Sequence, residues 1–245
     1  MNLTANVFDE MGIYWSEIAD KNQTEKQIQF LKSHLKRDGY VLDLACGTGR
    51  HSTPLSQQGF NMVGLDVSVN LLQIAKKRYR QVQLVRGDMR FLPFKPQAFA
   101  AVVSMDTSFG YLPSERDDRA SLTEVRRALI QRGVFVVDVF NIQELIAKYT
   151  EKNHPSKWKE YPSFFLQQKR TLSQSGNLLC DLWTIRDKAS GRLVVFEHTA
   201  RLYKRIELEG LVANAGFAIE RIYGGYEGED FDLNSPRLIL VTNTK

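Results

Sequence analysis

Two glycines separated by one residue follow a short, mostly apolar run in the stretch VLDLACGTGRHS, from Val41 to Ser52. Glycine at a turn from strand to helix permits positive φ angles and lets a ligand approach the backbone, and the start of a helix offers free amide groups. We therefore expect Gly47 and Gly49 to lie against a bound small molecule. A dinucleotide-binding turn has a third glycine three residues after the second, but Ser52 occupies that position.

Carboxylates stand at the ends of the next two strand-like segments. Asp66 ends VGLD, where a carboxylate can accept hydrogen bonds from both hydroxyls of a ribose. Asp88 in RGDM can accept a hydrogen bond from an exocyclic amine. Together these residues describe a pocket for an adenosine-bearing ligand. Asp43 lies inside the first strand, and because a buried carboxylate is costly without a partner, we expect it to organise the loop or to meet a cation.

The segments that would position these residues alternate between strands and helices. Apolar residues at i, i+3 and i+7, such as Ile28, Leu31 and Leu35, indicate amphipathic helices, and glycines mark where helices end. The pattern predicts helices over residues 24–37, 50–58, 68–79, 114–130 and 206–216, and strands over residues 41–44, 60–67, 81–85, 98–105, 134–140, 218–224 and 237–243. Strands and helices that alternate in this way form parallel βαβ units with right-handed crossovers, so we expect a doubly wound α/β sheet.

The alternation breaks between Trp158 and Tyr203. Three strand-like runs in this segment are separated by the turn sequences SQSGN and DKASGR, which is typical of an antiparallel meander. The meander follows the fifth strand, on a connection that leaves the carboxyl edge of the sheet, where open α/β folds bind their ligands. We therefore divide the chain into an α/β domain of residues 1–155 and 204–245 and an inserted antiparallel β lid of residues 156–203.

Four segments resemble the conserved motifs of a known family. VLDLACGTGRH, GLDVS, RGDMRFLPF and FAAVVSMDTSFGYL are similar to motifs I to IV of the class I S-adenosylmethionine-dependent methyltransferases. The later segments HTARLY and IELEGLVANAGFAIERIYGGY resemble the branch that methylates small molecules and carries a β-sheet lid. The resemblance covers roughly residues 8 to 243. It implies a Rossmann-like doubly wound sheet of seven strands, mostly parallel with an antiparallel last strand, and S-adenosylmethionine as the cofactor, with no metal.

The resemblance also implies which residues bind the cofactor. Gly47 and Gly49 would line its methionine portion, Asp66 its ribose, and Asp88 with Met89 its adenine. A segment before the first helix resembles the amino-terminal flap of the family. The complete set of expected cofactor-binding residues is Tyr14, Trp15, Asp43, Ala45, Gly47, Gly49, Arg50, Asp66, Val67, Asp88, Met89 and Met105.

Four details of the sequence bear on this assignment. Arg50 could pair with Asp43 or with the carboxylate of the cofactor. The family often has glycine where Ala45 stands, and PGG where this chain has QRG before the fifth strand. His51 follows the loop directly, and we expect it on the helix surface.

The chemistry follows from the cofactor. A methyl group leaves a sulfonium by in-line displacement, for which the protein supplies alignment and a dry pocket, so a general base is optional. Residues expected to face the acceptor are Asp106, Tyr111, Asn141, His198 and Arg201. The best candidate for a catalytic base is His198, which alternation places on one face of a lid strand with Phe196 and Ala200; the alternative is a structural histidine of the small sheet.

We therefore predict an enzyme that transfers a methyl group from S-adenosylmethionine to a nitrogen or oxygen atom of a small-molecule acceptor. Three alternatives stay open. The sequence DTSF at 106–109 begins and ends like the (D/N)PP(Y/F) motif of nucleic-acid base methyltransferases, but both prolines are absent. A nicotinamide-dependent dehydrogenase is disfavoured by Ser52 and by the lack of a recognisable hydride-transfer dyad. A non-catalytic binding protein would retain the same pocket.

Composition and charge narrow the setting. The net charge is +5, but the basic residues are scattered, and KKRYR at 76–80 follows a helical pattern typical of a solvated helix face, which disfavours nucleic acid as a partner. No run of 18 apolar residues or signal-like amino terminus is present. Cys46 and Cys180 are too few for a disulfide framework or a zinc cluster. We expect a cytoplasmic protein that does not enter a membrane.

Overall fold

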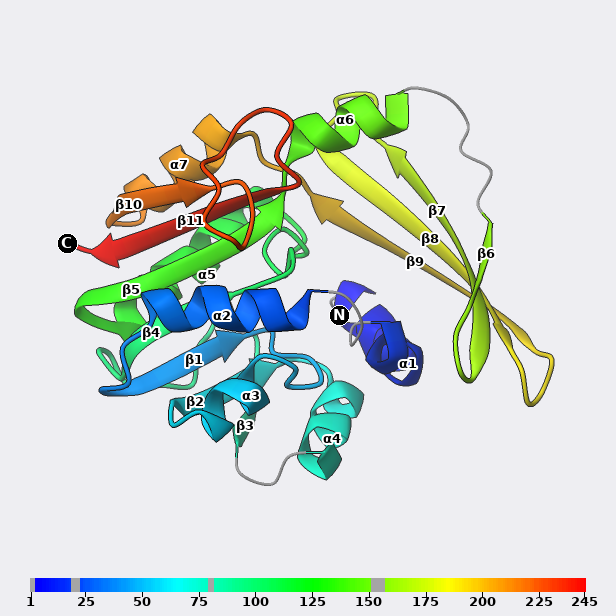
Figure 1. Cartoon of the computed structure of the whole chain (residues 1–245), viewed down its shortest axis with the longest axis horizontal. Helices are drawn as coiled ribbons and strands as arrows, with labels where there is room; N and C mark the ends of the chain where they lie inside the picture. Colours follow the sequence, from blue (N-terminus) through cyan, green and yellow to red (C-terminus); the bar gives the residue numbers. More distant parts are fainter. Residues whose placement is uncertain (1–2, 19–22, 79–81, 151–156) are drawn as a thin grey trace.

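A seven-stranded sheet forms the centre of the molecule in the computed structural model, which describes residues 3–18, 23–78, 82–150 and 157–245 (Figure 1). The strand order is β10-β11-β5-β4-β1-β2-β3. Neighbouring strands from β5 to β3 are parallel, whereas β11 is antiparallel to both β5 and β10. The strands are β1 (Tyr40–Leu44), β2 (Asn61–Asp66), β3 (Gln83–Arg86), β4 (Phe99–Ser104), β5 (Leu129–Phe140), β10 (Phe217–Tyr223) and β11 (Arg237–Thr244). This arrangement confirms the predicted Rossmann-like, doubly wound α/β fold with an antiparallel last strand.

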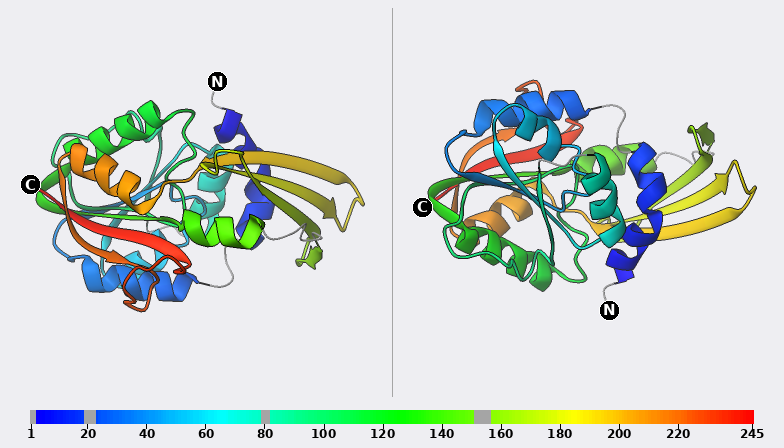
Figure 2. Two further views of the ribbon diagram at one scale, coloured as in Figure 1. Left: turned by 90° about the horizontal axis from the view of Figure 1, so that it is seen from above. Right: turned by 90° about the horizontal axis from the view of Figure 1, so that it is seen from below.

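Helices cover both faces of this sheet. Helices α2 and α3 lie on one face and α5 and α7 on the other (Figure 2). Because successive strand residues point to opposite faces, Val41 packs in the cluster that contains Leu31 of α2, and the next residue, Leu42, packs in the cluster that contains Leu122 of α5. The helices of the α/β domain are α2 (Thr24–His34), α3 (Ser52–Gln57), α4 (Val69–Arg78), α5 (Glu115–Ala128), α6 (Ile142–Thr150) and α7 (Arg205–Asn214).

A second, four-stranded antiparallel sheet follows β5 and α6 in the chain, and we call it the small sheet. Its strands are β6 (Trp158–Glu160), β7 (Phe164–Leu172), β8 (Leu178–Asp187) and β9 (Leu193–Arg201). The sequence predicted three strands there, because the three residues of β6 are too short to show alternation. The small sheet extends to one side of the molecule (Figure 1). The boundary predicted between residues 155 and 156 lies outside the described residues.

An additional helix at the amino terminus lies between the two sheets (Figure 1). This helix, α1 (Leu3–Ile18), was not predicted as a helix. Met11 on α1 is buried in one cluster with Phe164, Trp183 and Phe196 of the small sheet. On its other side, Asp9 accepts hydrogen bonds from the hydroxyl and backbone amide groups at the start of α4. Helix α1 therefore joins the small sheet to the α/β domain.

The small sheet is also fixed at the end of β9. The backbone amide of Arg201 donates to the Gly110 carbonyl at 2.8 Å, and its guanidinium donates to Asp118 at 2.9 Å. The hydroxyl of Tyr203 donates to the same Asp118 carboxylate at 2.5 Å. Asp118 belongs to α5, so this contact holds the small sheet against the loop and helix that follow β4.

Some predicted bounds differ from the observed ones for local reasons. Helix α2 ends at His34 rather than 37, because Leu35 is extended. Helix α5 ends at Ala128, and β5 begins at once with Leu129, five residues before the predicted start. Arg132, in the QRG sequence, takes a left-handed φ of 57°. Residues 79 and 81, at the ends of a predicted helix and strand, lie outside the described residues.

Candidate functional site

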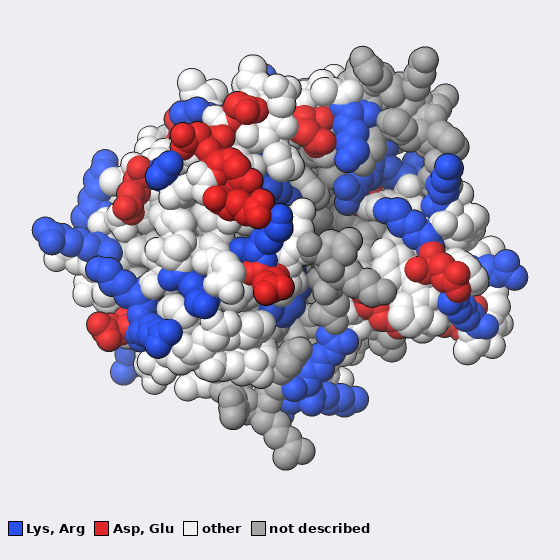
Figure 3. All heavy atoms as spheres, in the orientation of Figure 1, with Lys and Arg blue, Asp and Glu red and all other residues white. Residues whose placement is uncertain are grey.

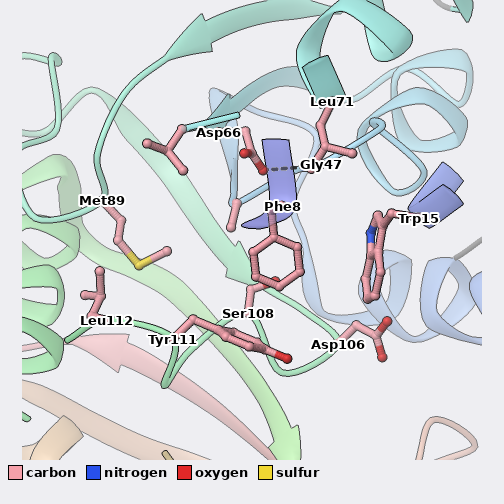
Figure 4. A pocket seen from close by; sticks show the side chains of 12 residues that line it. Phe8, Trp15, Gly47, Asp66, Leu71, Met89, Asp106, Ser108, Tyr111 and Leu112 are labelled. Atoms are coloured by element: carbon pink, nitrogen blue, oxygen red, sulfur yellow. Dashed lines mark hydrogen bonds between the residues drawn. The ribbon is translucent and has the colours of Figure 1, made fainter. Parts of the chain in front are cut away.

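A cavity opens at the carboxyl ends of β1, β2 and β4, beneath α1 (Figure 4). It has about 710 Å³ of atom-free space, its open mouth included. Ligand sites of doubly wound sheets occur at this edge. The lining residues are Phe8, Trp15, Ala45, Gly47, Asp66, Val67, Leu71, Met89, Asp106, Ser108, Tyr111 and Leu112.

The glycine loop presents bare backbone to this cavity at Gly47, whereas Gly49 is not among the lining residues. Gly47 and Gly49 have φ angles of 54° and 74°, in the left-handed region that glycine tolerates. A Cβ atom added to Gly47 would meet nothing nearer than Leu71 Cδ1 at 4.0 Å. The space above Gly47 therefore suits a ligand that approaches the backbone closely. Ala45 takes a φ of 57°, in the same left-handed region.

Asp66 is held by the loops on either side of it. Its Oδ2 accepts a hydrogen bond from the Gly47 amide at 2.8 Å (Figure 4), and its Oδ1 accepts one from the Ser68 amide at 2.8 Å. Burial raises the pKa of this carboxyl, while the amide hydrogen bonds lower it. Each carboxylate oxygen has a second lone pair, so Asp66 can still accept hydrogen bonds from two ribose hydroxyls. The residues present thus fit an adenosine-bearing ligand.

Asp43 organises the glycine loop, which is one of the two roles that its sequence position suggested. It is 1% exposed and accepts a hydrogen bond from the Ser52 hydroxyl at 2.5 Å, which ties β1 to the first residue of α3. Burial raises its pKa to about 6, because the ionised form loses its hydration. Asp43 does not line the cavity.

Arg50 pairs with Asp106 and not with Asp43. Its guanidinium donates to the Asp106 carboxylate at 2.7 Å, to Gln27 at 2.7 Å and to Thr24 at 3.0 Å. Arg50 therefore connects the glycine loop to the tip of β4 and to α2. Asp106 lines the cavity, whereas Arg50 lies behind it.

The expected surface position of His51 is wrong. His51 is 4% exposed, and its Nε2 donates to the Gln27 side-chain oxygen at 2.9 Å. Burial lowers its pKa well below the ordinary value, so the ring is neutral. Helix α2 covers the side of the glycine loop that we expected to be exposed to solvent.

The loop after β4 has an unusual backbone. Asp106 and Thr107 both have left-handed φ angles, 55° and 63°, which cost free energy in residues other than glycine. Asp138 on β5 stabilises this turn, because its carboxylate accepts from the Asp106 amide at 2.8 Å and its carbonyl accepts from the Thr107 amide at 2.9 Å. Arg237 pairs with Asp138 at 2.7 Å. The analysis of the sequence missed Asp138, although a carboxylate within an apolar strand was the signal that singled out Asp43.

The remaining predicted cofactor residues divide into two groups. Met89 and Val67 line the cavity. Asp88 does not, and both of its oxygens accept hydrogen bonds from Arg90. Met105 is 2% exposed in the core beneath the loop and does not reach the cavity surface.

Aromatic side chains form the outer wall of the cavity. The Phe8 ring lies against Tyr111 at a centroid distance of 5.1 Å, and Trp15 stands beside it (Figure 4). Trp15 also stacks on Trp183 of the small sheet at 5.5 Å. Tyr14, one residue earlier, faces the small sheet instead and contacts Phe164 at 5.1 Å. The lining residues that sequence reasoning missed are Phe8, Leu71, Ser108 and Leu112.

Three of the predicted acceptor-facing residues do not line the cavity. Asn141 donates to the backbone carbonyls of the loop before β11, including that of Ser235 at 2.8 Å. Arg201 holds Asp118, as described above. His198 lies one layer behind the wall, with its ring 5.8 Å from that of Tyr111. Asp106 and Tyr111, by contrast, face the space as predicted.

The described part of the chain has neither a cluster of metal-binding side chains nor a helix that could span a membrane. No set of three or more His, Cys, Asp or Glu side chains in it is arranged to hold a metal ion. None of its helices combines the length and the apolar character needed to cross a bilayer.

Comparisons with known proteins agree with this geometry. Residues 41–133 match a family described as a methyltransferase domain. The chain is 23% identical to a putative methyltransferase of Bacillus subtilis over 96% of both chains. It is 26% identical to the dTDP-3-amino-3,4,6-trideoxy-alpha-D-glucopyranose N,N-dimethyltransferase of Streptomyces venezuelae, over 84% of this chain and 86% of that protein.

A solved structure shares the whole fold. The CcbJ methyltransferase from Streptomyces caelestis superposes with a TM-score of 0.82 at 17% identity and covers 99% of this chain and 98% of its own. The glycine loop and Asp66 border one cavity at the edge of the sheet where doubly wound folds bind nucleotides. Residues 41–133 thus carry a methyltransferase domain, and the whole chain has the fold of solved methyltransferases, one of them described as S-adenosylmethionine-dependent.

Proposed function

We propose that this methyltransferase transfers the methyl group of S-adenosylmethionine to a nitrogen atom of a small-molecule acceptor. The observation that carries the proposal is one continuous cavity, bordered by Gly47 and Asp66 at one end and by Phe8, Trp15 and Tyr111 at the other. In this proposal the cavity holds the nucleoside cofactor beside a small organic group.

Nitrogen is favoured over oxygen as the acceptor atom for two reasons. The lining residues include two carboxylates, Asp66 and Asp106, and no Lys, Arg or His. Because Arg50 pairs with Asp106, the negative charge of the lining comes mainly from Asp66, and it favours the cationic sulfonium over an anionic oxygen nucleophile. Among the relatives, the Streptomyces venezuelae protein and a glycine/sarcosine N-methyltransferase 34% identical over 54% of this chain are both named for methylation of nitrogen.

The cofactor would lie along the tips of β1, β2 and β3. We assign its methionine portion to Gly47 and Gly49, its ribose to Asp66, and its adenine to the side of Met89 and Asp88. The bound cofactor supplies an electrophilic methyl group on a sulfonium. The aromatic side chains exclude water and hold the acceptor in line with that group, which is the main contribution a protein makes to such a displacement.

In this proposal the small sheet covers the bound methyl acceptor. We propose residues 156–203 as a lid, because the small sheet holds α1 in place and α1 supplies Phe8 and Trp15 to the cavity wall. Acidic and basic side chains are interspersed on the face shown in Figure 3. A continuous basic stripe, which favours nucleic acid, is absent from the described residues of that face. We place the enzyme in the cytoplasm, where its two unpaired cysteines would stay reduced.

Cofactor binding is tested by replacing Asp66 with Ala. We expect the affinity for S-adenosylmethionine to fall by about 1 to 3 kcal/mol, because the ribose hydrogen bonds are lost. Isothermal titration calorimetry with S-adenosylmethionine and with NAD measures this loss and the choice of cofactor. Asp230→Ala is the matched control, since this carboxylate is exposed and pairs with Arg221 on the surface. An unchanged dissociation constant in Asp66→Ala would remove the ribose assignment.

The acceptor class is tested with a labelled methyl group. S-adenosylmethionine with a labelled methyl is incubated with the enzyme and either a small-molecule cell extract or total RNA. We expect label in small amines. Label in RNA alone would contradict the proposal, and label in small molecules at oxygen alone would correct the acceptor atom.

A further inference from the structure

Aromatic rings surround His198 on the inner face of the small sheet. Its ring lies 5.5 Å from the Phe8 ring and 5.8 Å from the Tyr111 ring, measured between centroids. Trp183 closes a third side at 5.6 Å. Phe8 and Tyr111 both line the cavity, so the imidazole packs against two residues of the cavity wall.

The two nitrogens of this imidazole have different surroundings. Nε2 lies 3.8 Å from Asp181 Oδ2. Nδ1 is buried and has no hydrogen-bond partner in the part of the chain that the structure describes. A buried nitrogen without a hydrogen-bond partner costs free energy. A bound ligand could supply the missing partner to this atom.

Asp181 is fixed by several donors. It is 3% exposed and accepts from the Gln168 amide at 2.7 Å, from Arg170 Nε at 2.8 Å and from the Trp183 indole at 2.8 Å. A carboxylate beside Nε2 favours the tautomer with its proton on that nitrogen. Nδ1 of His198 then carries a bare lone pair and can only accept a hydrogen bond.

Burial, more than the nearby charges, keeps the His198 ring neutral. Burial lowers the pKa of His198, and Arg170 lowers it further, while Asp181 raises it. Burial raises the pKa of Tyr111, so its phenol stays protonated. Helix α1 contributes the uncharged Phe8 to this environment. A neutral imidazole is the state that can take a hydrogen from an incoming group.

We infer that His198 Nδ1 accepts a hydrogen bond from the N–H group of the methyl acceptor. The reactive amine enters between Phe8 and Tyr111. Asp181 is the positioning residue that selects the His198 tautomer. This inference rests on the proposed function and narrows it to primary and secondary amines, because a tertiary amine has no N–H to donate. The acceptor lone pair forms the bond to the methyl carbon while the carbon–sulfur bond breaks, and the sulfur keeps the electron pair. The proton of the resulting ammonium passes to Nδ1 and then to solvent, with Asp181 stabilising the transient imidazolium.

The tautomer is tested by ¹⁵N NMR of histidine-labelled enzyme with S-adenosylhomocysteine added, the His198 signals being assigned by their loss in His198→Phe. We expect a proton on Nε2 and none on Nδ1 in the wild type. In Asp181→Asn the amide can donate to Nε2, so the proton should move to Nδ1. A wild-type proton on Nδ1, or a tautomer that Asp181→Asn leaves unchanged, would overturn the inference and leave the proposed function intact.

Turnover tests the hydrogen bond itself, with labelled S-adenosylmethionine and the amine fraction of a small-molecule cell extract as probes. We expect His198→Phe to lower kcat about 100-fold with cofactor affinity unchanged. His198→Asn, whose amide oxygen can replace Nδ1 as the acceptor, should recover at least part of this loss. His34→Phe is the matched control, because His34 lies on α2 and bonds to Tyr223.

The outcomes of the turnover test separate the two proposals. Wild-type activity in His198→Phe, or equal losses in the Phe and Asn variants, would overturn the role of His198 while the methyl transfer stands. Failure of the wild type to label any amine would contradict the proposed function, and this inference with it.

Discussion

The guanidinium of Arg50 donates to the carboxylate of Asp106 at 2.7 Å and so joins the glycine loop to the tip of β4. Asp106 and Thr107 both carry left-handed φ angles, a conformation that persists only where surrounding contacts hold it. Arg50 is therefore part of what shapes the cavity wall, although it does not touch the cavity. It acts from the loop that follows β1 on the loop that follows β4.

Replacing Arg50 with Met tests this relationship. The side chain keeps most of its packing but leaves Asp106 without its cation, so we expect a loss of about 1 to 3 kcal/mol in the free energy of unfolding and weaker binding of S-adenosylmethionine. Urea denaturation and calorimetry measure the two effects. Arg221→Met is the control, because its ion pair with Asp230 is exposed and should contribute little to stability. Equal effects in the two variants would show that the Arg50 contact is not special.

Asp43 predicts a pH dependence of stability. Its pKa is about 6 in the folded chain and 3.8 when unperturbed, because burial opposes ionisation. Between about pH 4 and 6 the folded state thus holds a proton that the unfolded state releases, so stability falls as pH rises through this window. The free energy of unfolding is therefore lower at pH 7, where Asp43 is ionised, than below pH 4, where it is protonated, by roughly 2 to 3 kcal/mol.

The variant Asp43→Asn isolates this contribution, since its amide oxygen can still accept from Ser52. We expect the difference in unfolding free energy between Asp43→Asn and the wild type to shift in favour of the variant as pH rises from 4 to 7. Urea denaturation at each pH measures it, and the subtraction removes the contribution of other groups such as Asp66. A difference that stays constant over this range would contradict the raised pKa.

Local signals were sufficient for much of the fold and for the inner part of the site. The strands were readable because apolar residues alternate or run together, and Gly47 and Asp66 were readable because each stands where a strand ends. Such features depend on neighbours in the sequence. Asn141 also ends a strand, yet the loop before β11, which is distant in the sequence, engages its amide.

The outer wall of the cavity depends on contacts between distant segments. Phe8 meets Tyr111 and His198 only because α1 packs between the two sheets. In the same way, His51 is buried because α2 covers it through Gln27. No spacing rule within a single segment reports such a contact, so these positions could not be found from sequence patterns.

Ser114 offers a test of a helix start that the sequence did indicate. Its hydroxyl accepts a hydrogen bond from the Asp117 amide at 3.2 Å at the start of α5. Ser114→Ala should lower the free energy of unfolding by about 1 kcal/mol, because the hydroxyl's hydrogen bonds with the Asp117 amide and carboxylate are lost, whereas Ser114→Thr, which keeps a hydroxyl, should retain most of the stability. Thermal and urea unfolding measure both variants. A Ser114→Ala variant as stable as the wild type would show that the cap contributes nothing.

Gly110 tests how the small sheet is attached to the α/β domain. Its φ is 108°, and an added Cβ would lie 2.4 Å from the carbonyl oxygen of Arg201, which belongs to the backbone and cannot move aside cheaply. The same two residues share a 2.8 Å hydrogen bond. Gly110→Ala should therefore force β9 away from the loop after β4, with loss of methyl transfer and a stability loss of about 3 kcal/mol or more.

Gly191 provides the matched control for this substitution. It also has a left-handed φ, 69°, but a Cβ there would meet nothing within 4 Å. Gly191→Ala then carries the backbone strain alone, about 1 to 2 kcal/mol, and should retain methyl transfer. The difference between the two variants, measured by urea denaturation and by labelled methyl transfer, isolates the clash with Arg201. Equal stability and activity in both would mean that the contact between Gly110 and Arg201 does not hold the small sheet in its active position.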